Sequence, residues 1–283
     1  MVYGLSYNVE NTFSRITTIN DLEKIKGSKY YQANLSTSYP QIEEDLKNNK
    51  IVLVCATPCQ IAGLKQKFFN YENLITIGVV CHGTPSKETL DKFCLQTYGE
   101  LPTSINFRKK NPYWTDFDIE FKFNNKTVTE RANKNKWFAS FLSNTFLNNC
   151  CYNCNFAGKD YGADIILGDF WGINKIDKKF YDPYGTSICI CATEKGQILF
   201  QQIKETLITK QFNNLDKITQ YNICIVKTNY GINKEYNQEL FYINDQKGLT
   251  FEENIKEIEK VSPVQKRSFI KRVLRKIKRI LFK

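Results

Sequence analysis

The hydrophobic and polar positions between residues 50 and 90 form two successive strand-turn-helix patterns. The first, "KIVLVCATPCQIAGLKQKFF", has an apolar run at 50–55, a proline-containing turn, and helical periodicity from about Gln60 to Phe69. The second, "NLITIGVVCHGTPSKETL", has an apolar run at 74–80, a Cys-His-Gly-Thr-Pro turn, and Ser86 as the N-cap of a helix. Two such units in succession predict an α/β fold, with a mainly parallel sheet and flanking helices.

The middle of the chain has a different pattern. "FDIEFKFNNKTVTERA" alternates apolar and polar residues over 117–123, turns at two asparagines, and returns through 127–131, which predicts an antiparallel hairpin in an insertion or second lobe. The pattern further predicts helices at 136–147 and from Glu194 to about Ile208. Between these helices it predicts strands in "ADIILGDFWG" and "GTSICICAT".

The ten cysteines point to metal or redox chemistry. The chain shows neither an apolar run long enough to span a membrane nor a signal peptide, so we expect a cytoplasmic protein, where clustered thiols seldom form a disulfide framework. Cys151 and Cys154 form a C-x-x-C pair, but a 4Fe-4S cluster needs four ligands. Cys59 and Cys81 each follow a predicted parallel strand, so they could meet at one sheet edge. Spacing alone leaves a second interpretation equally open, in which these two are ordinary turn residues and the pair binds zinc or nothing.

The other cysteines and the single histidine carry less information. Cys189 and Cys191 share one face of a predicted strand, where we expect them in the core rather than as ligands, and Cys55, Cys94 and Cys224 lie in apolar runs with the same expectation. With His82 as its only histidine, the chain offers no His dyad, Ser-His-Asp triad or His-rich metal site. We favour a structural role for His82 over proton transfer.

The net charge of +11 resides mainly in the last residues of the chain. No acid occurs from Ser262 onward, whereas "KRSFIKRVLRKIKRILFK" carries nine Lys and Arg, with apolar residues recurring at three- and four-residue steps. We therefore expect a main domain at 1–262 and a basic amphipathic tail at 263–283 that binds an anionic membrane surface; an acidic protein or RNA is the alternative partner of the tail. Charges elsewhere are nearly balanced, so no nucleic-acid-binding face is expected on the main domain.

Five motifs occur together in one order: "TPCQIAGL" at 57–64, "CHGTPS" at 81–86, "FRKK" at 107–110, "CYNC" at 151–154 and "DIILGDFWGI" at 164–173. With "GSKYYQA" at 27–33, they resemble the beta subunit family of coenzyme F420 hydrogenases and dehydrogenases, over roughly residues 2–200. The resemblance implies an iron-sulfur flavoprotein that passes electrons between a deazaflavin or nicotinamide donor, FAD and a 4Fe-4S cluster, and that works with a redox partner protein. Bacterial relatives also occur among surface-polysaccharide genes.

The resemblance also implies roles for individual residues. It makes Cys59, Cys81, Cys151 and Cys154 the cluster ligands. The residues that it places at the flavin or reductant site are Thr57, Pro58, Gln60, Arg108, Lys109, Asp169 and Trp171. Lys109 stands where family members commonly have an acid. The chain begins near the family's "VYGLSYN", without the ferredoxin-like segment and the Ser/Gly-rich turn, so an incomplete FAD site is expected. A truncated gene product, a subunit completed by another chain and a relative without redox activity are the alternatives. The competing hypothesis is a non-catalytic, cluster- or zinc-stabilised module of a polysaccharide-assembly complex at the membrane surface.

Overall fold

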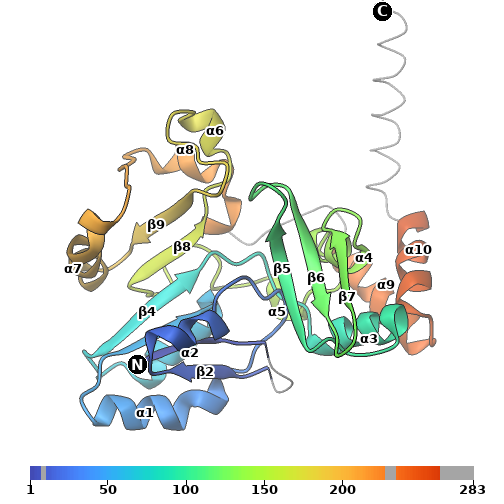
Figure 1. The fold of residues 1–283 in the computed structure, drawn as a ribbon, viewed down its shortest axis with the longest axis horizontal. Coiled ribbons are helices and arrows are strands. Elements are labelled where there is room, and N and C mark those ends of the chain that lie inside the picture. Colours follow the sequence, from blue (N-terminus) through green and yellow to red (C-terminus); the bar gives the residue numbers. More distant parts are fainter. Residues whose placement is uncertain (8–10, 227–233, 262–283) are drawn as a thin grey trace, which may run out of the picture.

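The computed structural model describes residues 1–7, 11–226 and 234–261, which form two β-sheets with flanking helices (Figure 1). In the larger sheet the strands follow the order β2-β1-β3-β4-β8-β9. Strands β1, β3, β4 and β8 run parallel, and β2 and β9 pair antiparallel at the two edges. The bounds of these strands are Val2–Leu5 (β1), Phe13–Ile16 (β2), Val52–Ala56 (β3), Leu74–Val79 (β4), Ile165–Asp169 (β8) and Ser187–Cys191 (β9). The predicted α/β class with a mainly parallel sheet is confirmed.

Two helices, α1 (Tyr39–Lys47) and α2 (Pro58–Lys67), bury their apolar residues with one face of this sheet. The buried cluster joins Leu46 of α1 and Leu64 of α2 to Val54 of β3. Helix α2 begins two residues earlier than predicted, because a proline fits the first turn of a helix, where its missing N–H is not needed.

The second strand-turn-helix unit also forms as predicted. Helix α3 (Lys87–Tyr98) follows β4 and begins after Ser86, whose hydroxyl accepts a hydrogen bond from the Thr89 backbone N at 3.3 Å. Gly99 ends the helix in the left-handed conformation, with φ at 82°. The carboxyl ends of β3 and β4 therefore lie side by side, and a turn leads from each strand into a helix.

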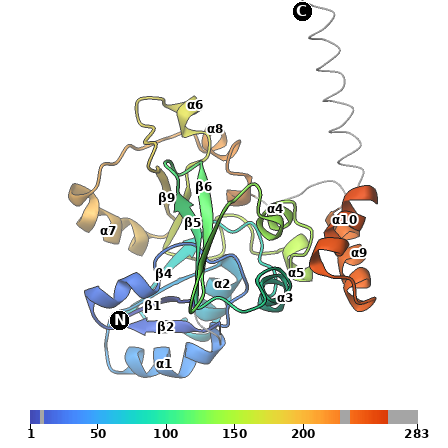
Figure 2. The same cartoon turned by 45° about the vertical axis from the view of Figure 1, so that its right-hand side comes forward.

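The smaller sheet contains β5 (Ser104–Lys110), β6 (Phe117–Lys122) and β7 (Thr127–Arg131) in that order. The hairpin of β6 and β7 confirms the prediction, whereas β5 was not predicted as a strand. Figures 1 and 2 both show this sheet beside α3, α4, α9 and α10, with which it shares a large aromatic core. The bounds of the last three helices are Lys136–Leu142 (α4), Lys234–Gln246 (α9) and Phe251–Val261 (α10).

Two predicted helices are shorter in the structure. Helix α4 ends at Leu142 rather than 147, because Asn144 has a φ of 57° that a continuing helix does not allow. Helix α7 ends at Ile203 and continues only as a 3-10 turn. No helix in the described ranges is long and apolar enough to cross a bilayer. The remaining elements are η1 (Ile19–Lys24), η2 (Ser36–Ser38), α5 (Asn149–Tyr152), α6 (Ile173–Ile176), α7 (Glu194–Ile203), η3 (Lys204–Thr206), α8 (Leu215–Thr219) and η4 (Ile223–Ile225).

The expectation that Cys189 and Cys191 belong to the core is wrong. Cys189 is exposed and Cys191 is half-buried. Their strand, β9, lies at the sheet edge, and its other face carries Ile188 and Ile190 toward buried clusters. Among the other cysteines expected in apolar surroundings, Cys94 is buried, whereas Cys55 and Cys224 are half-buried.

Candidate functional site

The first turn of α2 is held by hydrogen bonds around Cys59. The Gln60 side-chain oxygen accepts from the Thr57 backbone N at 3.2 Å and from the Thr57 hydroxyl at 2.9 Å. The Gln60 amide nitrogen donates to the Ala33 carbonyl at 2.9 Å, which ties the turn to the segment before α1. The Thr57 hydroxyl lies 3.5 Å from the Cys59 sulfur, and Cys59 itself is exposed. Thr57, Pro58 and Gln60 thus fix the position of a thiol at the end of β3.

The turn after β4 contacts the segment that carries Cys151. The Gly83 backbone N donates to the Cys81 sulfur at 3.4 Å, and the Thr84 backbone N donates to the Cys151 sulfur at 3.5 Å. The Asn148 backbone N in turn donates to the Thr84 carbonyl at 2.9 Å. Two sulfurs that lie 70 positions apart in the sequence are therefore held by adjacent peptide groups of one turn.

Gly83 allows this close approach. Its φ is +119°, a backbone conformation that residues with a side chain rarely adopt. A Cβ at this position would lie 2.7 Å from the Leu147 side chain and 3.3 Å from the Cys151 Cβ. The turn and the cysteine segment can therefore pack together because residue 83 has no side chain.

Electrostatic effects link Cys81 to the other three predicted ligands. Burial raises the pKa of the Cys81 thiol to about 12; the Gly83 N–H opposes this shift, and the thiols of Cys151, Cys59 and Cys154 add to it. Burial likewise raises the pKa of Cys151 to about 11. Both thiols are thus protonated near neutral pH in the metal-free chain, so metal binding here has to release protons.

The four predicted ligands are all thiols, which is the donor set of a 4Fe-4S cluster. Zinc needs four ligands about 2.3 Å from one metal. Among the described residues, no three His, Cys, Asp or Glu side chains gather closely enough to hold one metal ion. A cubane cluster spreads its four thiolates around an inorganic core and accepts N–H hydrogen bonds at sulfur, which the Gly83 and Thr84 peptides can provide.

The only histidine lies in the same turn as Cys81. The His82 ring meets Phe141 edge to face, with ring centroids 5.0 Å apart. This packing against α4 agrees with the structural role that we favour for His82.

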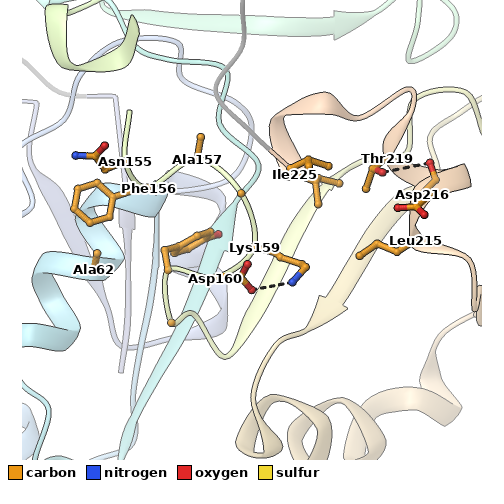
Figure 3. Close-up of a pocket in the computed structure, with 14 residues that line it drawn as sticks. Ala62, Asn155, Phe156, Ala157, Lys159, Asp160, Leu215, Asp216, Thr219 and Ile225 are labelled. Atoms are coloured by element: carbon orange, nitrogen blue, oxygen red, sulfur yellow. Dashed lines mark hydrogen bonds and ion pairs between the residues drawn. The ribbon is translucent and has the colours of Figure 1, made fainter. Parts of the chain in front are cut away.

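A cavity of about 650 Å³ begins directly after Cys154 (Figure 3). One wall is the loop at 155–162, Ala62 of α2 forms another part, and α8 with the following turn closes the opposite side. Within the loop, Lys159 and Asp160 form an ion pair at 2.9 Å. The volume lies within the range of small-molecule and cofactor sites.

The predicted flavin-site residues of the later motifs lie elsewhere. Arg108 on β5 forms an ion pair with Asp169 at the end of β8 and donates to the Trp114 carbonyl at 3.0 Å. The Trp114 and Trp171 rings are 4.6 Å apart, and the Arg108 guanidinium lies about 6 Å from each. The structure thus brings Arg108, Asp169 and Trp171 together as a link between the two sheets, while Lys109 forms an ion pair with Glu120 on β6.

Sequence reasoning did not identify the residues that line the cavity. The signal that could have found the loop is "NFAGKDYG", which places two glycines directly after the C-x-x-C pair. Both glycines have positive φ, and Gly158 approaches the Val226 carbonyl, 3.5 Å from an added Cβ. The opposite wall, Leu215 to Val226, lies in an Asn- and Lys-rich region where the sequence pattern is weak.

Comparison with known proteins shows the family of the chain. Residues 49–219 match the family described as the C terminus of the coenzyme F420 hydrogenase/dehydrogenase beta subunit. The chain belongs to this family. The match includes all four cysteines and most of the cavity wall. Curated proteins give no match.

A solved structure has a similar fold. It is a chain of the F420-reducing nickel-iron hydrogenase complex from Methanosarcina barkeri, in a xenon derivative. The TM-score is 0.50 at 14% identity, over 88% of this chain and 80% of that chain. At this identity the likeness concerns the fold alone.

Proposed function

We propose that this protein is an oxidoreductase subunit for electron transfer, with a 4Fe-4S cluster held by Cys59, Cys81, Cys151 and Cys154. The observation that carries the proposal is the contact between the turn after β4 and the Cys151 segment, where neighbouring peptide N–H groups point at two of the four sulfurs. The membership of the chain in the beta subunit family supports the same chemistry.

The same proposal places FAD in the 650 Å³ cavity. The cavity wall begins at the residue after Cys154, and the helix that carries Cys59 supplies Ala62 to it. A flavin exchanges hydride for single electrons, which a cluster then carries one at a time. The chain's own contribution is to hold the thiolates, to supply N–H donors to sulfur, and to line the cavity with the aromatic rings of Phe156 and Tyr161.

The remaining predicted site residues receive supporting roles in this proposal. Thr57, Pro58 and Gln60 position Cys59. Arg108 and Asp169 support Trp171, which is 43% exposed and can contact the flat ring of a deazaflavin or nicotinamide donor. Electrons then pass to or from a redox partner protein. By the family resemblance, we place this activity in surface-polysaccharide biosynthesis, on the inner face of the cell membrane.

Cysteine variants test the ligand set. After anaerobic reconstitution we expect the wild type to hold iron and acid-labile sulfide, and Cys59→Ser and Cys151→Ser to lose both, because each removes one thiolate of four. Cys189→Ser is the matched control, since this exposed thiol lies on the edge strand, and it should retain the cluster. A wild type without iron and sulfide, or the reverse pattern among the variants, contradicts the proposal.

A pair of substitutions on α2 tests the flavin site. Ala62→Leu adds three carbons inside the cavity, and we expect at least about tenfold weaker FAD binding, or ~1.4 kcal/mol, with the iron content unchanged. Gln66→Leu adds a leucine to an exposed position of the same helix and should leave FAD binding as in the wild type. Fluorescence titration with FAD measures both. Equal affinities in the two variants would place the flavin outside this cavity.

A further inference from the structure

Tyr161 connects the cavity to the strand that leads to Cys81. It is part of the cavity wall, but its hydroxyl is buried against Gly78 in β4. A Cβ on Gly78 would lie 1.9 Å from the hydroxyl oxygen. A glycine within a strand often marks a close approach of another group, and here that group is the hydroxyl of Tyr161.

This hydroxyl has no hydrogen-bond partner among the described residues. An unpaired buried donor costs about 1–3 kcal/mol, so such groups in folded proteins usually serve a bound ion, water or ligand. A group bound beside Tyr161 can therefore accept the hydrogen bond that no described residue accepts from this hydroxyl.

The surroundings of the hydroxyl indicate which group this is. Gly78 precedes Cys81 by three residues, so the hydroxyl lies near the end of β4 where Cys81 stands. Burial raises the pKa of Tyr161, and the electrostatic effect of Cys81 and Cys55 raises it further. Of the two sulfurs that contribute to this shift, Cys81 is a predicted cluster ligand.

We propose that the Tyr161 hydroxyl donates a hydrogen bond to a sulfur of the iron-sulfur centre at Cys81 and so raises its reduction potential. The inference rests on the proposed function and adds a residue outside the ligand set to it. Reduction adds negative charge to the cluster, and a hydrogen-bond donor at sulfur stabilises that charge. Tyr161 is therefore a positioning and tuning residue, not a ligand.

The test compares two tyrosines that each bury an unpaired hydroxyl. Tyr161→Phe removes the hydroxyl and keeps the ring. Tyr31→Phe is the matched control, because its hydroxyl is also buried and unpaired among the described residues, but its charged neighbour is Asp91 rather than a cysteine. Iron and sulfide content and the cluster's midpoint potential are measured anaerobically for the full chain. We expect full cluster content in both variants, a more negative midpoint in Tyr161→Phe, and an unchanged midpoint in Tyr31→Phe.

Other outcomes overturn the inference. An unchanged midpoint in Tyr161→Phe with full cluster content means that the hydroxyl does not reach the cluster. If only the midpoint potential of the flavin changes in Tyr161→Phe, the hydroxyl contacts the ligand in the cavity instead of the cluster. Loss of iron in Tyr161→Phe contradicts a tuning role, since all four thiolates remain. A wild type that assembles no cluster refutes the proposed function itself, and that result is seen before any variant is compared.

Discussion

At the scale of single residues, two glycines decide how closely the parts of the site approach. Gly83 leaves room for Leu147 and Cys151, and Gly78 leaves room for the Tyr161 hydroxyl. The sequence places Gly83 in a turn and Gly78 in a strand, but it contains no sign of which distant side chain fills the space. The positions of Cys59 and Cys81 at the ends of parallel strands could be predicted, whereas these contacts could not, because they depend on packing between segments far apart in the chain.

Replacement of Gly78 by alanine tests this contact. The new Cβ collides with the Tyr161 ring and hydroxyl, so we expect Gly78→Ala to lower the free energy of unfolding by about 1–3 kcal/mol. In a Tyr161→Ala background the collision is absent, and the same change should cost little. Urea denaturation of the four proteins in this double-mutant cycle gives the coupling.

A second glycine serves as control for that cycle. Gly63 on α2 is exposed, and an added Cβ lies 3.6 Å from its nearest neighbour, so Gly63→Ala should stabilise the helix by about 0.5–1 kcal/mol. Equal losses for Gly78→Ala in both backgrounds would show that Tyr161 is not the group that requires a glycine.

At the scale of elements, apolar periodicity predicted the buried parallel strands and their helices. It did not predict β5, because only Ile105 and Phe107 follow the alternation before three basic residues begin. The basic residues at the end of this strand form ion pairs with other strands. Arg108 pairs with Asp169 on the other sheet, and Lys109 pairs with Glu120 on β6. Apolar periodicity predicts which residues are buried, but it does not predict ion pairs between elements.

The carboxylate of Asp45 joins three elements in the amino-terminal part of the fold. It is 2% exposed and accepts from the Tyr3 hydroxyl on β1 at 2.7 Å and from Arg15 on β2 at 2.6 Å. Lys50, after α1, donates to its second oxygen at 2.8 Å. The hydrogen bonds from Arg15 are the main cause that holds the pKa of Asp45 well below its ordinary value.

This arrangement predicts a loss of stability in acid. Because the pKa is lower in the folded state, the stabilisation is complete above the unfolded-state pKa of about 4 and is lost as the pH falls toward the folded value. We expect Asp45→Asn to lose about 2–3 kcal/mol at pH 7, where wild-type Asp45 is charged, and to show a weaker pH dependence below pH ~4. Chemical denaturation at a series of pH values measures both effects.

A surface ion pair provides the comparison for Asp45. Asp21 pairs with Lys24 one helical turn away, and both side chains are substantially exposed. Asp21→Asn should therefore change the free energy of unfolding at pH 7 far less than Asp45→Asn does, because solvent screens an exposed ion pair. If the two variants are equally stable, the buried carboxylate does not join the three elements as described.

At the scale of the whole molecule, the sequence predicted the sheet edge that Cys59 and Cys81 share, but not the cavity. Both cysteines that end parallel strands lie at one sheet edge by the topology of the fold, so a general rule brings them together. The cavity is built from α2, the 155–162 loop and the segment around α8, which are separated by more than 50 residues at each step. No local sequence pattern predicts this cavity, because it forms only when the sheet places the three segments next to each other.

The distribution of charge over the whole chain leads to the last prediction. The basic tail at 263–283 lies outside the described residues, and its lipid binding is predicted from the sequence alone. Each basic residue near an anionic surface contributes ~1 kcal/mol, while the nearly balanced main domain contributes little net attraction. We therefore expect removal of 263–283 to weaken binding to vesicles containing phosphatidylglycerol by at least about 100-fold at low salt.

Changes in vesicle composition and salt concentration test whether the tail binds anionic lipid by electrostatic attraction. The full chain should bind phosphatidylcholine vesicles poorly, and salt should weaken its binding to anionic ones, because screening shortens the range of the attraction. The truncated chain should keep its iron, since all four predicted ligands precede the tail. Unchanged vesicle binding after truncation would refute the lipid role. Tight binding of the tail to RNA together with weak vesicle binding would instead favour a nucleic acid partner. We expect the lipid result, because the apolar residues that recur along the tail would make no favourable contact with a phosphate backbone.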